Sequence, residues 1–215
     1  MHPAAADWYA RRTTTAPDWP LGRVLDLKGA TSVAVVIPAR NEAATVGDVV
    51  TQVRGDLAGL VDELVVIDSL SDDATSIVAG AAGATVHSVA DIRPDLGVRR
   101  GKGEALWKSA FVTSSDILVF IDADLTEWGT HFVTGLVGPM LADPRVLLAK
   151  GFYDRVLDMG TGVSTEGGRV TELVARPWLA LHRPELSAVV QPLAGERTIR
   201  RSLFEQLSIP VGYGI

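Results

Sequence analysis

The chain has 215 residues, 47% of them apolar, and a formal net charge of −6 from 26 acidic and 20 basic residues. This length and composition predict one large folded domain, or a domain with appendages. The excess of acidic residues and the lack of a Lys/Arg run argue against a surface that binds nucleic acid or an anionic membrane. The lack of Cys excludes disulfides, thiolate metal sites and a Cys nucleophile.

The N-terminal segment is rich in Ala, Thr and Pro and carries two tryptophans, Trp8 and Trp19. We expect residues 1–30 to form an irregular arm whose tryptophans dock on the body of the protein. No segment resembles a secretory leader, and no apolar run approaches the roughly 18 residues of a membrane-spanning helix. We therefore expect a cytoplasmic protein that does not interact with membranes.

From residue 32 onward, strand patterns alternate with helix patterns. We predict that Pro38 ends the first strand, because proline lacks a ladder donor. The alternation predicts an α/β fold with a doubly wound, mostly parallel sheet and flanking helices. Strands are predicted at 33–37, 64–67, 84–88, 117–121 and 146–152, and helices at 45–57, 74–82, 104–112 and 130–141.

The strand–helix pattern loosens after Phe152. We therefore expect a domain over residues 31–153 and a second region over residues 154–215. In the second region we predict a Gly/Thr/Ser loop, a helix over 169–181 and a mixed segment over 183–200.

Two carboxylates, Asp122 and Asp124, directly follow the apolar strand 117–121. Ligands of open α/β sheets bind beyond the carboxyl ends of strands, and two carboxylates there can hold a hard divalent cation and its phosphates. The pair therefore favours a metal–nucleotide site. Two alternatives stay open: plain acids at a strand end, and the aspartyl-phosphate motif of haloacid-dehalogenase-like phosphatases, which normally lies on the first strand.

Three further motifs suit anionic or nucleotide ligands. Lys102 lies between Gly101 and Gly103 before a predicted helix, which suits a diphosphate, although the spacing fails the P-loop pattern. Asp68 ends the second strand and either accepts hydrogen bonds from a nucleoside or takes part in local capping. Gly167 to Thr171 precede an apolar-periodic helix, where Arg169 could clamp a second anion or the glycines could simply cap the helix.

In order along the chain, these motifs resemble the GT-A glycosyltransferases. The resemblance rests on Val36 to Glu42, Val66 to Ser69, Gly101 to Trp107 and Phe120 to Leu125. The runs Gly167 to Pro177 and Gln191 to Glu196 make the chain similar to one family among them, the actinobacterial glucosyl-3-phosphoglycerate synthases. The similarity covers roughly residues 32 to 215.

The resemblance implies a retaining transfer of glucose from UDP-glucose to the 2-hydroxyl of 3-phosphoglycerate, with Mg²⁺ or Mn²⁺. It assigns residues 31–153 to the nucleotide sugar and 154–215 to the acceptor, and it allows for a homodimer. It assigns Asp124 to the metal and a role in catalysis to Asp122, Leu193 and Ala194. The implied nucleotide-sugar residues are Pro38, Ala39, Arg40, Glu42, Ser69, Lys102, Asp122 and Ala123, and the implied acceptor residues are Gly168, Arg169, Val170, Thr171 and Tyr213.

The chain departs from the family pattern at several positions. Arg40 stands where the family usually has Leu, Leu70 where it has Gly, and Ala123 and Ala194 where it has Ser. The sequence stops at Ile215, where the family continues to an acidic residue and a His that completes the metal site. Two alternatives to the synthase therefore stay open: a nucleotide-sugar-binding fragment with impaired turnover, and a related GT-A transferase with another sugar nucleotide or acceptor.

Overall fold

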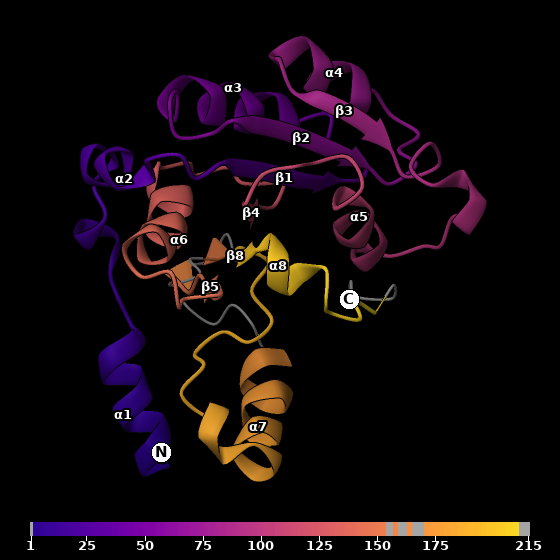
Figure 1. Ribbon diagram of the computed structural model, residues 1–215. Helices are drawn as coiled ribbons and strands as arrows, with labels where there is room; N and C mark the ends of the chain where they lie inside the picture. Colours follow the sequence, from indigo (N-terminus) through magenta and orange to yellow (C-terminus); the bar gives the residue numbers. More distant parts are fainter. Residues whose placement is uncertain (1, 154–156, 159–162, 165–169, 211–215) are drawn as a thin grey trace.

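The computed structural model describes residues 2–153, 157–158, 163–164 and 170–210. Its centre is a six-stranded sheet in the order β3-β2-β1-β4-β8-β5 (Figure 1). The strands are β1 (Val33–Ala39), β2 (Glu63–Asp68), β3 (Thr85–Ser88), β4 (Ile117–Phe120), β5 (Leu148–Lys150) and β8 (Arg197–Arg200). Strands β3, β2, β1 and β4 are parallel, and β8 is antiparallel to both of its neighbours. The expected mostly parallel sheet is confirmed.

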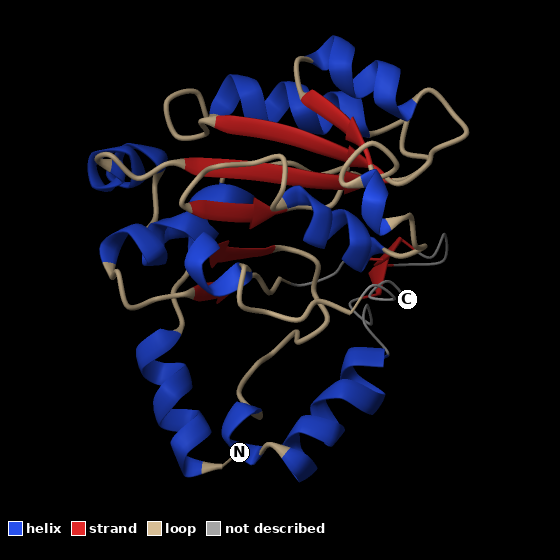
Figure 2. Cartoon of the chain, turned by 45° about the vertical axis from the view of Figure 1, so that its right-hand side comes forward, coloured by secondary structure: helices blue, strands red, loops and turns tan. Residues whose placement is uncertain are grey.

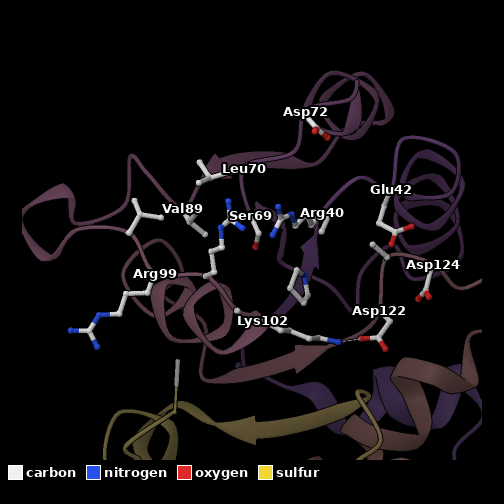
Figure 3. A pocket seen from close by; sticks show the side chains of 16 residues that line it. Arg40, Glu42, Ser69, Leu70, Asp72, Val89, Arg99, Lys102, Asp122 and Asp124 are labelled. Carbon is white, nitrogen blue, oxygen red and sulfur yellow. Dashed lines mark hydrogen bonds and ion pairs between the residues drawn. The ribbon is translucent and has the colours of Figure 1, made fainter. Parts of the chain in front are cut away.

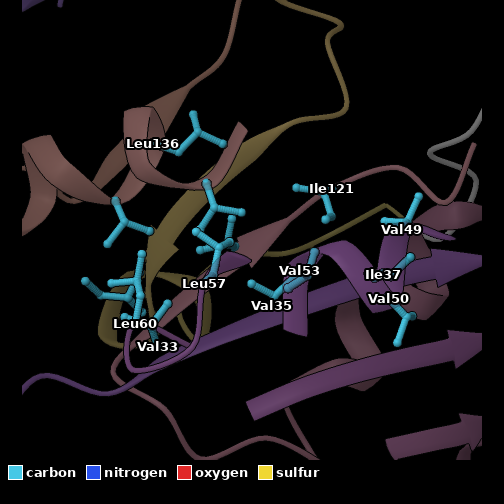
Figure 4. Close-up of a cluster of buried hydrophobic side chains, with 14 of the residues drawn as sticks. Val33, Val35, Ile37, Val49, Val50, Val53, Leu57, Leu60, Ile121 and Leu136 are labelled. Atoms are coloured by element: carbon cyan, nitrogen blue, oxygen red, sulfur yellow. The ribbon is translucent and has the colours of Figure 1, made fainter. Parts of the chain in front are cut away.

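Helices cover both faces of this sheet, as Figure 2 shows. The face formed by Val33, Val35 and Ile37 packs against α2 (Leu21–Lys28), α3 (Val46–Asp56), α4 (Thr75–Ala82) and α6 (His131–Ala142). The alternate residues Ala34 and Val36 pack against α5 (Lys102–Ser109) and α8 (Arg201–Phe204). Because successive strand residues point to opposite faces, the continuous apolar runs follow from burial on both sides. Figure 4 shows the first of these two cores.

The strand order reverses at β1. Strands β2 and β3 lie on one side of it, and β4 lies on the other. The chain segments that leave the carboxyl ends of β1 and β4 therefore diverge, and this leaves a crevice at the switch point. The fold thus places the residues after Ala39 and Phe120 around one opening.

Pro38 does not end the first strand, contrary to our prediction, since β1 continues to Ala39. The Val36 carbonyl accepts from the Ile121 N–H on the β4 side, whereas the Ala39 carbonyl accepts from the Ser69 N–H on the β2 side. Alternation places Pro38 on the β4 side, where the pairing of β1 with β4 has already stopped at Val36. The missing N–H therefore costs no ladder bond.

The N-terminal segment is helical rather than irregular. It forms α1 (Pro3–Arg12), η1 (Ala16–Asp18) and α2. Only one of its two tryptophans docks as expected: Trp19 is 6% exposed against α6, whereas Trp8 is 45% exposed. The indole Nε1 of Trp19 donates to Thr14 Oγ1 at 2.9 Å, which satisfies its polar atom.

The C-terminal half differs most from the prediction. The strand expected over 146–152 is confined to β5, and the segment 183–200, expected to be mixed, contains β8. Because β8 is inserted between β4 and β5, part of the 154–215 region belongs to the same sheet as residues 31–153. The helix expected over 169–181 is a π-helical turn, η3 (Thr171–Ala175), followed by α7 (Arg176–His182).

Short elements complete the described part of the chain. They are the 3₁₀ turns η2 (Pro94–Leu96) and η4 (Pro184–Leu186), and the paired strands β6 (Leu157–Asp158) and β7 (Val163–Ser164). Among the described residues, no helix combines the length and apolar character needed to cross a bilayer.

Candidate active site

A cleft of about 530 Å³ opens at the carboxyl edge of the sheet, where the strand order reverses. Figure 3 shows Glu42, Asp122 and Asp124 on one side of it and Arg99 on the other. Acidic and basic groups thus share one opening, a combination suited to a cation and an anionic ligand together. The cleft is lined by Pro38, Ala39, Arg40, Glu42, Ser69, Leu70, Asp72, Val89, Val98, Arg99, Arg100, Gly101, Lys102, Asp122, Ala123 and Asp124.

The loops that follow β1 and β2 are joined to each other by hydrogen bonds. The Asn41 N–H donates to Ser71 Oγ, and the Asp72 N–H donates to Asn41 Oδ1, both at 3.0 Å. The Glu42 N–H donates to Thr75 Oγ1 at 2.8 Å. Asn41 has a φ of 58°, a left-handed conformation that Asn tolerates better than most residues. These bonds fix Glu42 at the rim of the cleft.

Asp68 stabilises the loop after β2 and does not line the cleft. Its side chain accepts hydrogen bonds from the hydroxyls of Ser71 and Ser76, and the Ser71 N–H also donates to Oδ1 at 3.2 Å. The residue is 7% exposed. Of the two readings open from the sequence, the structure therefore favours local turn stabilisation over a direct contact with a nucleoside.

Lys102 reaches across the cleft from the first turn of α5. Its ammonium group forms an ion pair with Asp122, and both side chains are 28% exposed. The preceding residue, Gly101, has a φ of 138°, which strongly favours glycine, so the sharp entry into α5 depends on this residue. Helix α5 begins two residues earlier than predicted, and this places Lys102 on the helix rather than in the loop.

The loop before β8 forms the floor beside Asp122. Ala194 is buried, and its carbonyl accepts a hydrogen bond from the Lys150 ammonium group. Burial lowers the pKa of Lys150 to about 8, with the nearby Arg197 cation adding to the decrease. No individual role was predicted from the sequence for Lys150, which lies in a predicted strand, or for Glu196, which ends the run Gln191 to Glu196, because only the pairing of β5 with the unpredicted β8 brings the two side chains near each other.

A buried carboxylate supports the same loop. Glu196 is 2% exposed, and its Oε1 accepts from the Tyr153 hydroxyl at 3.1 Å. The Gly151 N–H donates to the Glu196 carbonyl at 3.0 Å. Gln191 bonds both the N–H and the carbonyl of Tyr153. The segment 191–196 is therefore held against the residues that directly follow β5.

The acidic side of the cleft fits a divalent cation in part. Asp124 is exposed at the cleft and Asp122 is half-buried beside it. Within the described ranges, no group of three His, Asp or Glu residues forms a complete protein cage. Mg²⁺ is commonly bound by only one or two carboxylates together with substrate phosphates and water, so this donor set suits a cation that arrives with a diphosphate.

The eight residues predicted for the nucleotide sugar all line the cleft, although four separate segments of the chain supply them. Leu193 and Ala194 lie in the neighbouring loop. Val170 is exposed and Thr171 is buried at the start of η3, and neither lines the cleft. The predicted acceptor residues Gly168, Arg169 and Tyr213 lie outside the described residues.

Sequence reasoning missed one whole wall of the cleft. Val89, Val98, Arg99 and Arg100 come from the polar loop before α5, which carried no recognised motif. The available signal was the adjacent Arg99 and Arg100 immediately before Gly101-Lys102-Gly103, which concentrates positive charge at a helix start. Asp72 also lines the cleft, although its sequence context indicated helix capping.

Comparison with known proteins identifies the class. The model of glycosyl transferase family 2 matches residues 34–206, and the chain belongs to this family.

Its relatives include glucosyl-3-phosphoglycerate synthase from Mycobacterium tuberculosis, which is 49% identical over 203 residues, 93% of this chain and 63% of the relative. The enzyme of that name from Mycolicibacterium smegmatis is 46% identical over 209 residues, 97% of this chain and 69% of the relative. The chain thus spans slightly less than two thirds of the Mycobacterium tuberculosis relative.

A solved structure of the Mycobacterium tuberculosis enzyme has the same fold as the chain. It contains Mn²⁺, UDP-glucose and phosphoglyceric acid, and it matches with a TM-score of 0.82 and 47% identity. The match covers 92% of this chain and 66% of that one. The resemblance read from the sequence motifs is confirmed.

Proposed function

We propose that the chain is a glucosyl-3-phosphoglycerate synthase, which transfers glucose from UDP-glucose to the 2-hydroxyl of 3-phosphoglycerate with retention of configuration. One observation carries this proposal. The eight residues assigned to the nucleotide sugar line a single cleft, in a chain 47% identical to an enzyme crystallised with UDP-glucose, Mn²⁺ and phosphoglyceric acid.

In this proposal the donor occupies the cleft with its diphosphate near Lys102. The ammonium group of Lys102, now paired with Asp122, would turn to the diphosphate and stabilise the negative charge that develops as UDP departs. Pro38, Ala39, Glu42 and Ser69, on the loops after β1 and β2, would contact the uridine. Arg40 would add positive charge beside it.

The metal ligand in this proposal is Asp124, with Asp122 beside it. Mg²⁺ or Mn²⁺ held there would neutralise the diphosphate and make it a better leaving group. Asp122 would also orient the transferred sugar, because its carboxylate lies between Lys102 and the loop that carries Ala194 and Gly195. The Leu193 and Ala194 backbone would shield the anomeric carbon from water.

The acceptor in this proposal is held by Gly168, Arg169, Val170, Thr171 and Tyr213. An Arg guanidinium binds phosphate through two parallel hydrogen bonds, which suits the phosphoglycerate phosphate. Both substrates are charged phosphorylated metabolites that do not cross an apolar bilayer unaided, and we therefore place the reaction in the cytoplasm.

The decisive experiment measures UDP release from UDP-glucose in the presence and absence of 3-phosphoglycerate, with Mn²⁺. We expect acceptor-dependent release, loss of release in Lys102→Gln, and a raised KM for 3-phosphoglycerate with unchanged UDP affinity in Arg169→Ala. GDP-mannose and GDP-glucose in parallel reactions test the alternative donors.

Binding of UDP without acceptor-dependent release would favour the nucleotide-sugar-binding fragment. The absence of both would overturn the proposal. Equal loss of donor and acceptor binding in Arg169→Ala would contradict separate donor and acceptor sites.

A further inference from the structure

A buried ion pair lies inside α5, immediately behind the cleft. Lys108 Nζ lies 2.9 Å from Glu104 Oε1, and the two side chains are 0% and 3% exposed. Removing two charges from water is costly, and well-packed apolar residues often replace such a pair without loss of stability. A contribution to folding stability is therefore a poor explanation for this buried pair.

The bonds of this pair to backbone atoms point to another role. Lys108 Nζ donates to the carbonyl oxygens of Val89 at 2.6 Å and Gly97 at 2.8 Å. Together with Glu104 Oε1, these acceptors match the three N–H donors of an ammonium group. The second carboxylate oxygen of Glu104 accepts from the Arg99 N–H. Three backbone groups between residues 89 and 99 are thus bonded to one buried pair.

These three groups belong to the segment of residues 89–101, which we call the wall loop. Five of its residues line the cleft: Val89, Val98, Arg99, Arg100 and Gly101. Figure 3 shows two of them, Val89 and Arg99, on the opposite side from Asp124.

The wall loop buries little of its own surface over residues 93–100, which are all exposed. Its backbone also passes through positive φ at Arg93 (48°) and Gly97 (72°). The φ of Arg93 is unfavourable for a residue with a Cβ. The buried side chains of the wall loop, Val89 and Ile92, lie at its start, whereas the bonds to Glu104 and Lys108 fix the backbone further along, at Gly97 and Arg99.

We propose that Glu104 and Lys108 are positioning residues that hold the wall loop in the shape that binds a nucleoside diphosphate. The pair fixes the backbone on both sides of Val98 and so holds the Arg99 and Arg100 backbone in the wall of the cleft. Neither Glu104 nor Lys108 lines the cleft itself, so both act through the loop. This inference rests on the proposed function and deepens it, because it concerns the same donor site.

The test separates positioning from simple stabilisation with three variants. Lys108→Met leaves Glu104 buried without its partner, Glu104→Gln removes the opposite charge, and the double variant removes both. Removing one partner of a buried pair destabilises strongly, whereas removing both restores much of the loss. The backbone carbonyls of Val89 and Gly97 nevertheless lose their donor in the double variant.

We expect the double variant to regain most of the stability that Lys108→Met loses, as measured by urea unfolding. Its Kd for UDP in the presence of Mn²⁺, measured by calorimetry, should stay about tenfold above that of the unchanged protein. Val53→Ala is the matched control, because Val53 is fully buried in the core on the other face of the sheet. That variant should lose stability and keep its Kd.

Hydrogen exchange of the Arg99 amide is an independent measurement that needs no ligand. We expect slow exchange in the unchanged protein, fast exchange in the double variant and slow exchange in Val53→Ala. An unchanged Kd in the double variant, or a Kd that follows stability through all variants including Val53→Ala, would overturn the positioning role. If the unchanged protein bound no UDP, the proposed function would fail. Equal exchange rates of the Arg99 amide in the unchanged protein and the double variant would instead show that the buried pair does not hold the wall loop.

Discussion

Gly195 lies directly against the carboxylate of Asp122. A β-carbon on residue 195 would come within 2.5 Å of Asp122 Oδ2 and 2.6 Å of Oδ1, closer than real β-carbons approach other atoms. The absence of a side chain at this position is what lets the loop before β8 close on the strand-end carboxylate. The positions of the Asp122 carboxylate and of the loop before β8 therefore depend on one close contact with the Gly195 backbone.

We predict that Gly195→Ala displaces the Asp122 carboxylate and disrupts its ion pair with Lys102. The Kd for UDP with Mn²⁺, measured by calorimetry, should rise about tenfold, and overpacking should cost about 1–3 kcal/mol of stability. Gly55→Ala in α3 is the control, since nothing lies within 4 Å of its added β-carbon. It should leave the Kd unchanged, and an unchanged Kd in Gly195→Ala itself would show that Asp122 tolerates displacement.

Asp124→Asn should abolish the dependence of UDP binding on Mn²⁺. The change is nearly isosteric and the side chain is exposed, so the free energy of unfolding should change by less than about 0.5 kcal/mol. The measurement is UDP calorimetry with and without Mn²⁺. Asp72→Asn is the matched control, because Asp72 is also exposed and lines the same cleft. In this variant, UDP binding should still depend on Mn²⁺. Retained Mn²⁺ dependence in Asp124→Asn would contradict its assignment to the metal.

Trp19→Ala should destabilise the protein by about 3–5 kcal/mol, because it leaves a cavity between α2 and α6. Trp8→Ala is the natural comparison, since Trp8 is 45% exposed and its loss should cost less than about 0.5 kcal/mol. Urea unfolding followed by circular dichroism measures both. Equal, small effects would mean that the N-terminal helices do not contribute to the core.

Lys150 should make the free energy of unfolding depend on pH in the alkaline range. Burial lowers the pKa of Lys150 to about 8, from its ordinary value of 10.5 in the unfolded chain. Between these values the unfolded state binds more protons, so this residue makes the free energy of unfolding rise with pH from about 8 to 10.5. Below pH 8 both states are protonated and its contribution is constant.

The Lys150→Met variant isolates this effect. We expect the stability of the unchanged protein, relative to the variant, to increase between pH 8 and 10.5 and to stay level between pH 6 and 7. Urea unfolding at each pH provides the difference, in which the other titrating groups cancel. A difference that is flat across the alkaline range would show that Lys150 keeps an ordinary pKa.

Local patterns predicted the elements that form the centre of the fold. The apolar runs at 33–37, 64–67 and 117–121 and the spacing of Val46, Val49, Val50 and Val53 identified strands and a helix that the structure contains. Strand β8 was missed because its four residues begin and end with Arg and include only one apolar side chain, Ile199, and only pairing with β4 and β5 makes this segment a strand. The N-terminal helices were missed because Ala-, Thr- and Pro-rich segments resemble irregular arms.

The sequence by itself determined the chemistry of the cleft, because the two carboxylates, the glycine-flanked lysine and the polar ends of two strands are local motifs. Their common location follows from parallel strands whose carboxyl ends meet at one edge. Only the tertiary structure decided how Asp122 is held between Lys102 and Gly195, and how a buried pair in α5 orders the wall loop. The contacts of Asp122 join residues far apart in the chain, and the bonds of the buried pair depend on burial and backbone geometry that no local pattern encodes.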